Sequence, residues 1–410
     1  MARSGALRLL AGVRDGLSLS DQAGALKALP PADQARAGRL AAEVLRHHDR
    51  ADAVIAAYVK RNPSPAVADL LRLATVELLD LGGAAHGVVD AAVTLARGMG
   101  QKGQAAAGMV NAVLRKIAAH QGWADLPPQD LPDWLRDPLL ACHGQAVVRA
   151  IEAAHQAGAP LDLTVKPGVT VEGADPLPTG SLRLHGPAQV SALPGFAQGD
   201  WWVQDAAAAL PVRLLDPRPG ERIADLCAAP GGKTLQLAAA GAQVTAVDIS
   251  PARLKRVADN LRRCGLAADL VAADALDWRP AGSLDAILLD APCSATGTIR
   301  RHPDLPFLRD GSGIPALIDL QARLIDHALS LIPPGGRMVY AVCSLLPDEG
   351  EAQIAAALSR HPGLTVEKPA LPGIGDGWLT PEGGIRTRPD YWPDRGGMDG
   401  FFMARLRRAG

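Results

Sequence analysis

The stretch from Asp225 to Thr234 constrains the fold of this chain more than any other. It reads Asp-Leu-Cys-Ala-Ala-Pro-Gly-Gly-Lys-Thr, follows the short apolar run 223–227 and opens onto apolar residues with helical spacing. This pattern predicts a strand, a glycine-rich turn and a helix N-terminus, where glycines admit a ligand and free N–H groups face it. In an α/β sheet, such a turn favours a nucleotide-like ligand.

The Gly-Lys-Thr ending is also found in phosphate-binding loops, but the rest of that motif is missing. A phosphate loop needs a glycine five positions before its second glycine, and Cys227 stands there. The Gly-x-Gly-x-x-Gly spacing of dinucleotide sites is absent as well. We therefore exclude a nucleoside triphosphate, and the rest of the chain must identify the nucleoside.

Composition limits the class of protein. The 410 residues, 48% hydrophobic and 21% charged, are typical of a globular protein with two or three domains. A net charge of -1 means that a nucleic-acid site would depend on local basic clusters. The five cysteines are widely spaced, which argues against a disulfide framework or a metal site, and no apolar run could span a membrane. We expect a cytoplasmic monomer that binds no metal and no membrane.

The pattern of apolar residues divides the chain into three parts. Residues 1–125 show helical spacing throughout and predict an all-helical domain. Residues 126–205 combine a linker rich in Pro and Asp, one helix and short β-like pieces, which indicates a small α+β module. Strands and helices alternate over 206–410, the pattern of a doubly wound, Rossmann-like α/β domain. Its strands are expected at 222–227, 243–248, 269–272, 284–290, 337–342 and 401–406.

Two acidic residues at expected strand ends describe the ligand further. Asp248 ends the second strand, where it could accept hydrogen bonds from ribose hydroxyls; alternatively it caps the helix that starts at Pro251. Asp274 follows the third strand and could accept from an adenine amine, or form a turn. Together with the glycine-rich turn, these residues describe an adenosine site with no need for phosphate. S-adenosylmethionine fits that description.

Two Cys-Ser pairs end neighbouring strands of the same sheet. The fourth strand ends in Asp290-Ala-Pro-Cys293-Ser, and the fifth is followed by Cys343-Ser344. A single cysteine is more often a small buried hydrophobic residue. Because the carboxyl ends of parallel strands meet in one crevice, however, two such pairs favour a chemical role.

A thiol, a carboxyl group and a proton acceptor are what methylation of cytosine at carbon 5 requires. Carbon 5 is a weak nucleophile until a thiolate adds to carbon 6, and an acid near ring nitrogen 3 stabilises the adduct. A base must then remove the proton from carbon 5 so that the thiol can leave. All three kinds of group are present at the expected strand ends.

These motifs resemble the Sun family of RNA cytosine-5 methyltransferases, in particular its RsmB type, which acts on small-subunit ribosomal RNA. The resemblance rests on residues 225–234, 290–294, 297–304, 334–340 and 399–402. The front of the chain looks like the NusB-type RNA-binding helical domain, on the evidence of residues 42–46, 71–78 and 110–115. The first resemblance implies a methyl transfer from S-adenosylmethionine to RNA, and the second implies an RNA-docking role for residues 1–125.

The resemblance also implies roles for individual residues. Cys343 would be the nucleophile, Cys293 would assist product release, Asp290 would bind the cytosine edge and Lys233 would lie near the target base. The cofactor would contact Ala228, Ala229, Pro230, Gly231, Gly232, Lys233, Asp248, Asp274 and Asp290. Departures from the family pattern at Lys166, Ala295, Val342 and Gly350 affect the expected positioning of the substrate rather than the chemistry.

Of the basic residues, Arg300 and Arg301 are the ones expected to contact RNA phosphates, because they follow the Cys293 loop in sequence. Three alternatives stay open. Cys293 could be the nucleophile, as in the DNA cytosine methyltransferase scheme. The same chemistry could act on transfer RNA, or the chain could be a non-catalytic RNA-binding scaffold.

Overall fold

The computed structural model describes residues 1–186 and 189–409 and contains two compact units. The first unit comprises Met1–Gly158 and Ile299–Gly311, and the second comprises Ala159–Thr298 and Ser312–Gly410. The chain therefore leaves the second unit shortly after Cys293 and returns to it at Ser312. The expected boundary at residue 125 does not coincide with the end of the first unit at Gly158, and the three-part division stays a prediction.

The first unit is helical, as predicted for residues 1–125. Its core consists of aliphatic side chains at helical spacing, including the fully buried Leu71, Leu114 and Ile117. The last long helix breaks at Gly144, where φ is 78° and ψ is 167°. The α-helices are α1 (Ala2–Arg14), α2 (Pro31–Arg46), α3 (His48–Ala56), α4 (Pro65–Leu79), α5 (Ala85–Arg97), α6 (Gly100–Ile117), α7 (Asp133–Ala157) and α11 (Leu305–Leu308).

The second unit begins with a small antiparallel sheet in the order β2-β3-β1-β4. It packs around Leu163, Leu184 and Trp201, all of which are buried. Its strands are β1 (Leu161–Val165), β2 (Ala174–Pro176), β3 (Leu182–Leu184) and β4 (Trp201–Val203).

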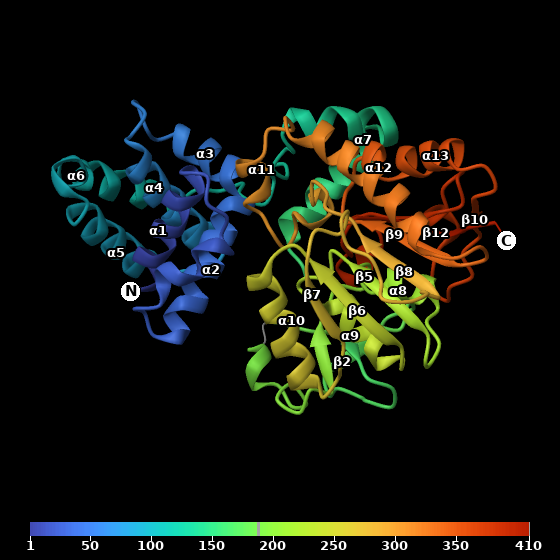
Figure 1. Ribbon diagram of the computed structural model, residues 1–410. Coiled ribbons are helices and arrows are strands. Elements are labelled where there is room, and N and C mark those ends of the chain that lie inside the picture. The colour runs from blue at the N-terminus through green and yellow to red at the C-terminus, as the bar shows by residue number, and fades with distance from the viewer. Residues whose placement is uncertain (187–188, 410) are drawn as a thin grey trace. The chain divides into compact units, whose positions relative to one another are not determined.

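The large sheet of the second unit has eight strands, and its main path runs β10-β12-β9-β8-β5-β6-β7. From β9 to β7 all neighbouring strands are parallel, whereas β12 runs antiparallel to β9, β10 and β11 (Figure 1). The strands are β5 (Arg222–Leu226), β6 (Gln243–Asp248), β7 (Asp269–Ala272), β8 (Ala286–Asp290), β9 (Arg337–Val342), β10 (Thr365–Glu367), β11 (Ile385–Thr387) and β12 (Phe401–Arg407).

Helices cover both faces of this sheet. Helices α12 (Ile314–Leu331) and α13 (Glu351–Arg360) pack on one face, and α8 (Leu210–Leu215) and α9 (Gly232–Ala239) on the other (Figure 1). Helix α10 (Pro251–Cys264) packs on α9. Burial on both faces explains why β8 is an uninterrupted apolar run up to Asp290. The predicted doubly wound α/β fold is confirmed.

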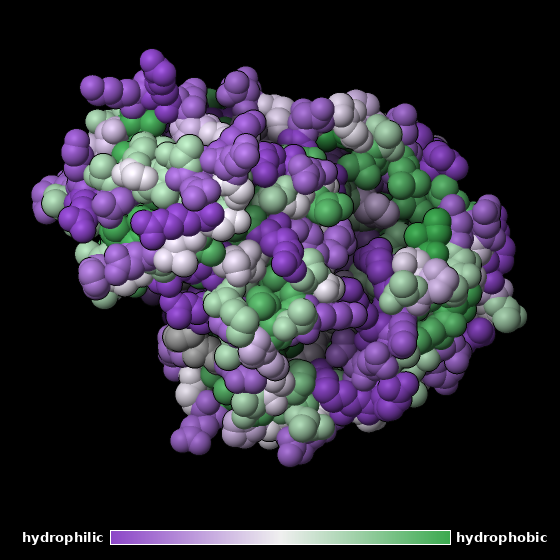
Figure 2. Space-filling view, turned by 90° about the vertical axis from the view of Figure 1, so that its left-hand side faces the viewer, coloured by the Kyte–Doolittle hydropathy of each residue, from purple (hydrophilic) through white to green (hydrophobic). Residues whose placement is uncertain are grey.

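Among the described residues, no helix is both long and apolar enough to cross a membrane. On the face shown in Figure 2, hydrophilic residues predominate, with hydrophobic residues distributed among them. One large aliphatic side chain is notable because of its position in the sequence: Ile249, directly after Asp248, is 69% exposed.

Candidate active site

The strand order places the candidate site at the carboxyl ends of β5 and β8. From β5 the chain moves outward through β6 to β7, and then continues on the other side of β5 with β8 and β9. Such a reversal of strand order opens a crevice at the carboxyl ends of the two central strands, where ligands bind in doubly wound folds. The carboxyl ends of β5, β6, β7, β8 and β9, together with the segments that directly follow them, carry all the predicted cofactor and catalytic residues.

The glycine-rich turn after β5 has the expected backbone. Gly231 has a φ of 102°, which favours glycine, and a Cβ there would lie 2.9 Å from a methyl carbon of Val257. Behind the turn, Asp225 is fully buried and accepts a 2.5 Å hydrogen bond from the Thr234 hydroxyl. Burial raises the pKa of Asp225 to about 7, although the Thr234 hydrogen bond opposes this shift. Its other oxygen, Oδ1, is buried without a hydrogen-bond partner.

Asp248 ties the end of β6 to this turn. Its Oδ2 accepts from the Ala229 N–H at 3.1 Å, and its Oδ1 accepts from the Ser250 N–H at 3.0 Å. The N-cap of α10 is Ser250, whose hydroxyl accepts from the Arg253 N–H. The alternative of Asp248 as the helix cap is therefore wrong. Arg253 also donates to the carbonyl of Ala229 at 2.5 Å, which further supports the turn.

Asp274 lies on an exposed turn after β7. Its Oδ1 accepts from the Leu276 N–H at 2.9 Å, so the turn-forming role is present. The carboxylate is nevertheless exposed and can accept further hydrogen bonds. The exposed Ile249 was not expected at this site, although an aliphatic residue directly after an acidic strand end was a visible signal.

Lys233 and Asp290 form an ion pair between the glycine-rich turn and the end of β8. Lys233 Nζ lies 2.8 Å from Asp290 Oδ2 and 5.2 Å from the centre of the Phe401 ring. Burial alone would lower the pKa of Lys233, but the charge and hydrogen bond of Asp290, together with the nearby Cys343, hold it above its ordinary value. The lysine is therefore a fixed cation between a carboxylate and a thiol.

The two thiols of the Cys-Ser pairs lie side by side. Cys293 Sγ is 3.5 Å from Cys343 Sγ, and both residues are half-buried and free of disulfides. The contact with Cys343, burial and the nearby Glu349 hold the pKa of Cys293 well above its ordinary value. The predicted convergence of the two strand ends is thus observed, and Cys293 stays a neutral thiol over the ordinary pH range.

Glu349 is a residue of this site that the sequence analysis did not single out. It lies in the turn Pro347–Glu349 after β9 and is completely buried. Its carboxylate accepts hydrogen bonds from Ser294 and Ser344, the residues that follow the two cysteines. Its place in the chain, a few residues beyond the second Cys-Ser pair, was the available signal.

Arg300 and Arg301 belong to the first unit with the rest of Ile299–Gly311. Arg300 is fully buried, its carbonyl accepts from Arg46 at 3.0 Å, and Arg301 is half-buried. Burial of the Arg300 side chain conflicts with the predicted phosphate contact, because a phosphate contact requires an accessible guanidinium. Arg300 is therefore not at the surface, where the sequence had led us to expect it.

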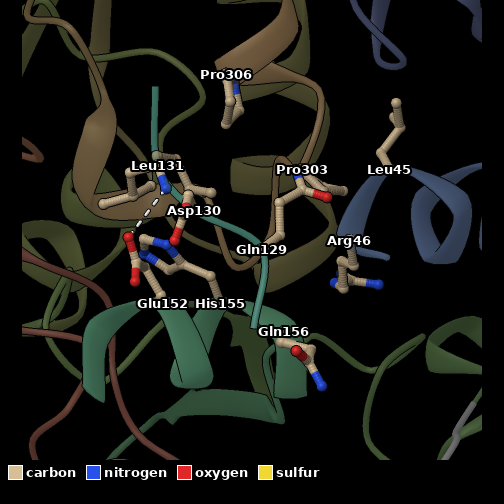
Figure 3. A pocket seen from close by; sticks show the side chains of 11 residues that line it. Leu45, Arg46, Gln129, Asp130, Leu131, Glu152, His155, Gln156, Pro303 and Pro306 are labelled. Carbon is tan, nitrogen blue, oxygen red and sulfur yellow. Dashed lines mark hydrogen bonds between the residues drawn. The ribbon is translucent and has the colours of Figure 1, made fainter. Parts of the chain in front are cut away.

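A small cavity of about 30 Å³ lies near this segment within the first unit (Figure 3). Its lining comes from α2, α7, the linker before α7 and the segment that begins at Ile299. The lining residues include Glu152, His155, Pro303 and Pro306. Glu152 accepts from the Leu131 N–H at 3.0 Å, as the dashed line shows. Burial lowers the pKa of His155 to about 3, so this imidazole is neutral.

Two family models match the chain in the same order as its parts. Residues 1–119 match the NusB family, and residues 212–407 match the family described as 16S rRNA methyltransferase RsmB/F. Among solved structures, a methyltransferase homolog protein from Pyrococcus horikoshii has a TM-score of 0.53 at 29% identity, covering 68% of this chain and 99% of its own. The protein PH0851 has a TM-score of 0.75 at 24% identity and covers 98% of both chains, which supports the fold alone.

Two of the curated relatives that match the chain share a name. The ribosomal RNA small subunit methyltransferase B of Klebsiella pneumoniae (strain 342) is 46% identical over 55% of this chain, and the match spans about half of that protein, 51%. The protein of the same name from Xanthomonas campestris pv. campestris is 36% identical over 100% of this chain and 97% of its own length. On this full-length match, the chain belongs to the family of ribosomal RNA small subunit methyltransferase B.

Proposed function

We propose that this protein transfers a methyl group from S-adenosylmethionine to carbon 5 of a cytosine in small-subunit ribosomal RNA, through a cysteine adduct at carbon 6. The observation that carries the proposal is the pair of thiols 3.5 Å apart at the ends of β8 and β9. One of them contributes to the raised pKa of Lys233, which is paired with Asp290. A thiol, a cation and a carboxylate at one crevice are the parts that this reaction requires.

The residues around the glycine-rich turn fit S-adenosylmethionine. The polar groups at this crevice are backbone N–H donors at the start of α9 and the carboxylate acceptors of Asp248, Asp274 and Asp290, which suit an amine-bearing nucleoside. The unpartnered Oδ1 of Asp225 adds a buried acceptor behind the turn. When bound, S-adenosylmethionine supplies an electrophilic methyl group. Asp248 would accept from the ribose hydroxyls, Asp274 from the adenine amine, and Ile249 would cover a face of the adenine ring.

Cys343 is the proposed nucleophile because it lies near the Lys233 ammonium group, whose pKa it helps to raise. A cation near a sulfur stabilises the charged form, which is the nucleophilic one. The Cys343 sulfur forms a bond to carbon 6, and the π electrons of the ring double bond move toward carbon 5, which becomes nucleophilic. Asp290, whose Oδ2 lies 2.8 Å from Lys233 Nζ, would bind the cytosine edge by accepting a hydrogen bond from the exocyclic amine of the base.

Cys293 is the proposed partner in release of the product. After carbon 5 has gained the methyl group, a base removes its proton, the ring double bond re-forms and the bond between Cys343 and carbon 6 breaks. Cys293 keeps its proton because of its raised pKa, and it lies 3.5 Å from the departing sulfur. It can therefore hydrogen-bond the developing thiolate and stabilise the leaving group.

RNA is the proposed partner of the NusB-like residues 1–119 and of Arg301. The target base must leave its stack to reach Cys343, at a cost of a few kcal/mol that single-stranded or loop RNA reduces. The name shared by the relatives favours ribosomal RNA over transfer RNA. The intact thiols and carboxylates favour an enzyme over a scaffold.

The test is methyl transfer by the purified full chain to unmodified small-subunit ribosomal RNA, with unmodified transfer RNA as the matched control. We expect labelled methyl incorporation into ribosomal RNA, with bisulfite sequencing reporting one or few 5-methylcytosines. RNA that contains 5-fluorocytosine should form a denaturation-resistant adduct. Incorporation into transfer RNA alone would contradict the proposal that ribosomal RNA is the substrate. Methylation at another atom, or no adduct, would contradict the mechanism.

A further inference from the structure

One buried carboxylate, that of Glu349, bonds both loops that carry the thiols, in addition to the direct contact of the Ser294 and Ser344 hydroxyls at 3.1 Å. Glu349 is 0% exposed, and its two oxygens have four donors. Oε1 accepts from the Ser294 N–H at 2.9 Å and from the Gln321 amide at 3.0 Å. Oε2 accepts from the hydroxyls of Ser294 and Ser344, each at 2.5 Å. Both serines directly follow a cysteine, one after β8 and the other after β9.

Glu349 is itself held in place by two further residues, one on β9 and one on α12. The Tyr340 hydroxyl, on β9, donates to the carbonyl of Glu349 at 2.6 Å. The Gln321 amide of α12 donates both to Glu349 and to the carbonyl of Pro292, the residue before Cys293, at 2.9 Å. Short hydrogen bonds to a buried carboxylate are among the stronger ones in proteins, and leaving such a carboxylate without donors is costly. The two Cys-Ser loops and the carboxylate therefore form one cooperative unit.

We propose that Glu349 is a positioning residue that sets the separation of Cys293 and Cys343 through Ser294 and Ser344. It is a positioning residue and not a catalytic one, because it is fully buried and its carboxylate oxygens accept from Ser294, Ser344 and Gln321. Its carboxylate spans the gap between two strand ends, so a shift of one loop is transmitted to the other. The catalytic consequence rests on the proposed function, whereas the effect on the distance between the thiols does not.

The distance between the thiols can be tested without any assay of methylation. In a Cys142→Ala background, which removes the exposed cysteine, diamide oxidises the chain and peptide mapping quantifies the Cys293–Cys343 disulfide. Disulfide formation requires the two sulfurs to meet in a narrow geometry. We expect Glu349→Gln, Ser294→Ala and Ser344→Ala each to slow this reaction, by about tenfold for Glu349→Gln, since small misplacements of reacting groups cost large factors.

The matched control is Glu221→Gln. Glu221 pairs with Arg337 at 2.5 Å and so holds the opposite end of β9, away from the cysteines. This variant also loses a partly buried carboxylate in the same unit, and we expect its rate of disulfide formation to equal that of the background. Thermal unfolding of all variants separates a local loosening from a general loss of stability. If Glu349→Gln does not fold, the two serine variants carry the test.

The catalytic consequence is measured with 5-fluorocytosine RNA. We expect Glu349→Gln to lower the rate of adduct formation while the KM for RNA and the affinity for S-adenosylmethionine stay at wild-type values. Unchanged disulfide formation in Glu349→Gln and in both serine variants would overturn the positioning role. A slowed disulfide together with no adduct even in the wild type would support the positioning role and overturn the proposed function instead.

Discussion

Cys293 and Cys343 share a Cys-Ser motif, follow neighbouring parallel strands and are both half-buried, yet their surroundings differ in charge. The contact with Cys343, burial and the nearby buried carboxylate of Glu349 raise the pKa of Cys293. Cys343 lies toward Lys233, whose pKa it helps to raise. The same dipeptide thus provides a neutral thiol in one loop and a thiol beside a cation in the other. The difference comes from residues elsewhere in the chain.

The backbone around the two thiols differs as well. On the Cys343 side, the carbonyl of Cys343 accepts from the Gly297 N–H at 2.9 Å, and the carbonyl of Ser344 accepts from Arg386. On the Cys293 side, the carbonyl of Pro292 accepts from Gln321. The loop with the proposed nucleophile is therefore held by an arginine, and the loop with the proposed proton donor by a neutral amide. Each of these asymmetries can be removed by substitution.

The largest effect is expected from Cys343→Ala. Loss of the proposed nucleophile should lower methyl transfer by at least about a thousandfold, as with other catalytic nucleophiles. The measurement is labelled methyl incorporation into small-subunit ribosomal RNA, together with trapping by 5-fluorocytosine RNA. Binding of S-adenosylmethionine, followed by calorimetry, should persist as evidence of a folded site. Trapping that survives in this variant but disappears in Cys293→Ala would reverse the two roles.

Cys293→Ala should have a smaller effect of a different kind. Without the neutral thiol beside the departing sulfur, we expect turnover to fall about a hundredfold, the lower end for loss of a general acid or base. The covalent protein–RNA complex should still form with natural RNA, and should accumulate. Gel electrophoresis under denaturing conditions measures this complex, with Cys142→Ala as the control. A variant that forms no complex at all would contradict a role confined to release.

Lys233→Gln should reduce the electrostatic difference between the surroundings of the two thiols. Removal of the cation should slow alkylation of Cys343 by iodoacetamide several-fold at pH 8, because a nearby positive charge stabilises the nucleophilic, charged form of a thiol. In the wild type, Cys293 should react only at strongly alkaline pH. The sign follows from its raised pKa: the thiol stays neutral, and so unreactive, until the pH approaches that raised value. Mass spectrometry of the peptides that contain Cys293 and Cys343 measures how the alkylation of each depends on pH. Equal dependence in the wild type would contradict the difference between the two thiols.

Much of this site could be predicted because it depends on local motifs and on one topological rule. The strand, turn and helix of 225–234 are encoded in a contiguous stretch, and parallel strands bring Asp248, Asp290 and both Cys-Ser pairs to one edge. These predictions needed no knowledge of which residues pack together. The lysine and Asp290 were also expected at the site, although their ion pair was not.

The parts that could not be predicted depend on contacts between distant residues. Arg300 was expected on a surface because it follows the Cys293 loop, but Ile299–Gly311 clusters with the helical unit and the side chain is buried. Glu349 contacts Ser294 across 55 positions in sequence, and only the packing of the β8 and β9 ends reveals that contact. The short strands β10 and β11 were missed because their pairing with β12, rather than a pattern of their own, defines them.

The smallest effect is expected from Glu351→Gln, which tests the arginine on the Cys343 side. Glu351 accepts from Arg386 at 3.0 and 2.5 Å and so orients the guanidinium that donates to the carbonyl of Ser344. A neutral amide at residue 351 should weaken this support by about 1 kcal/mol, which corresponds to a roughly fivefold slower adduct formation.

Because Arg386 bonds the Cys343 loop, the alkylation rate of Cys343 should change in Glu351→Gln while that of Cys293 does not. The matched control is Glu367→Gln, since Glu367 pairs with Arg405 and Arg407 at the far end of β12 and should leave both rates unchanged. Equal changes at both cysteines would mean that the two loops respond as one unit through Glu349, and that the arginine does not distinguish them. A change confined to Cys343 would mean that the loop of the proposed nucleophile can move without moving the Cys293 loop, although Glu349 bonds both loops.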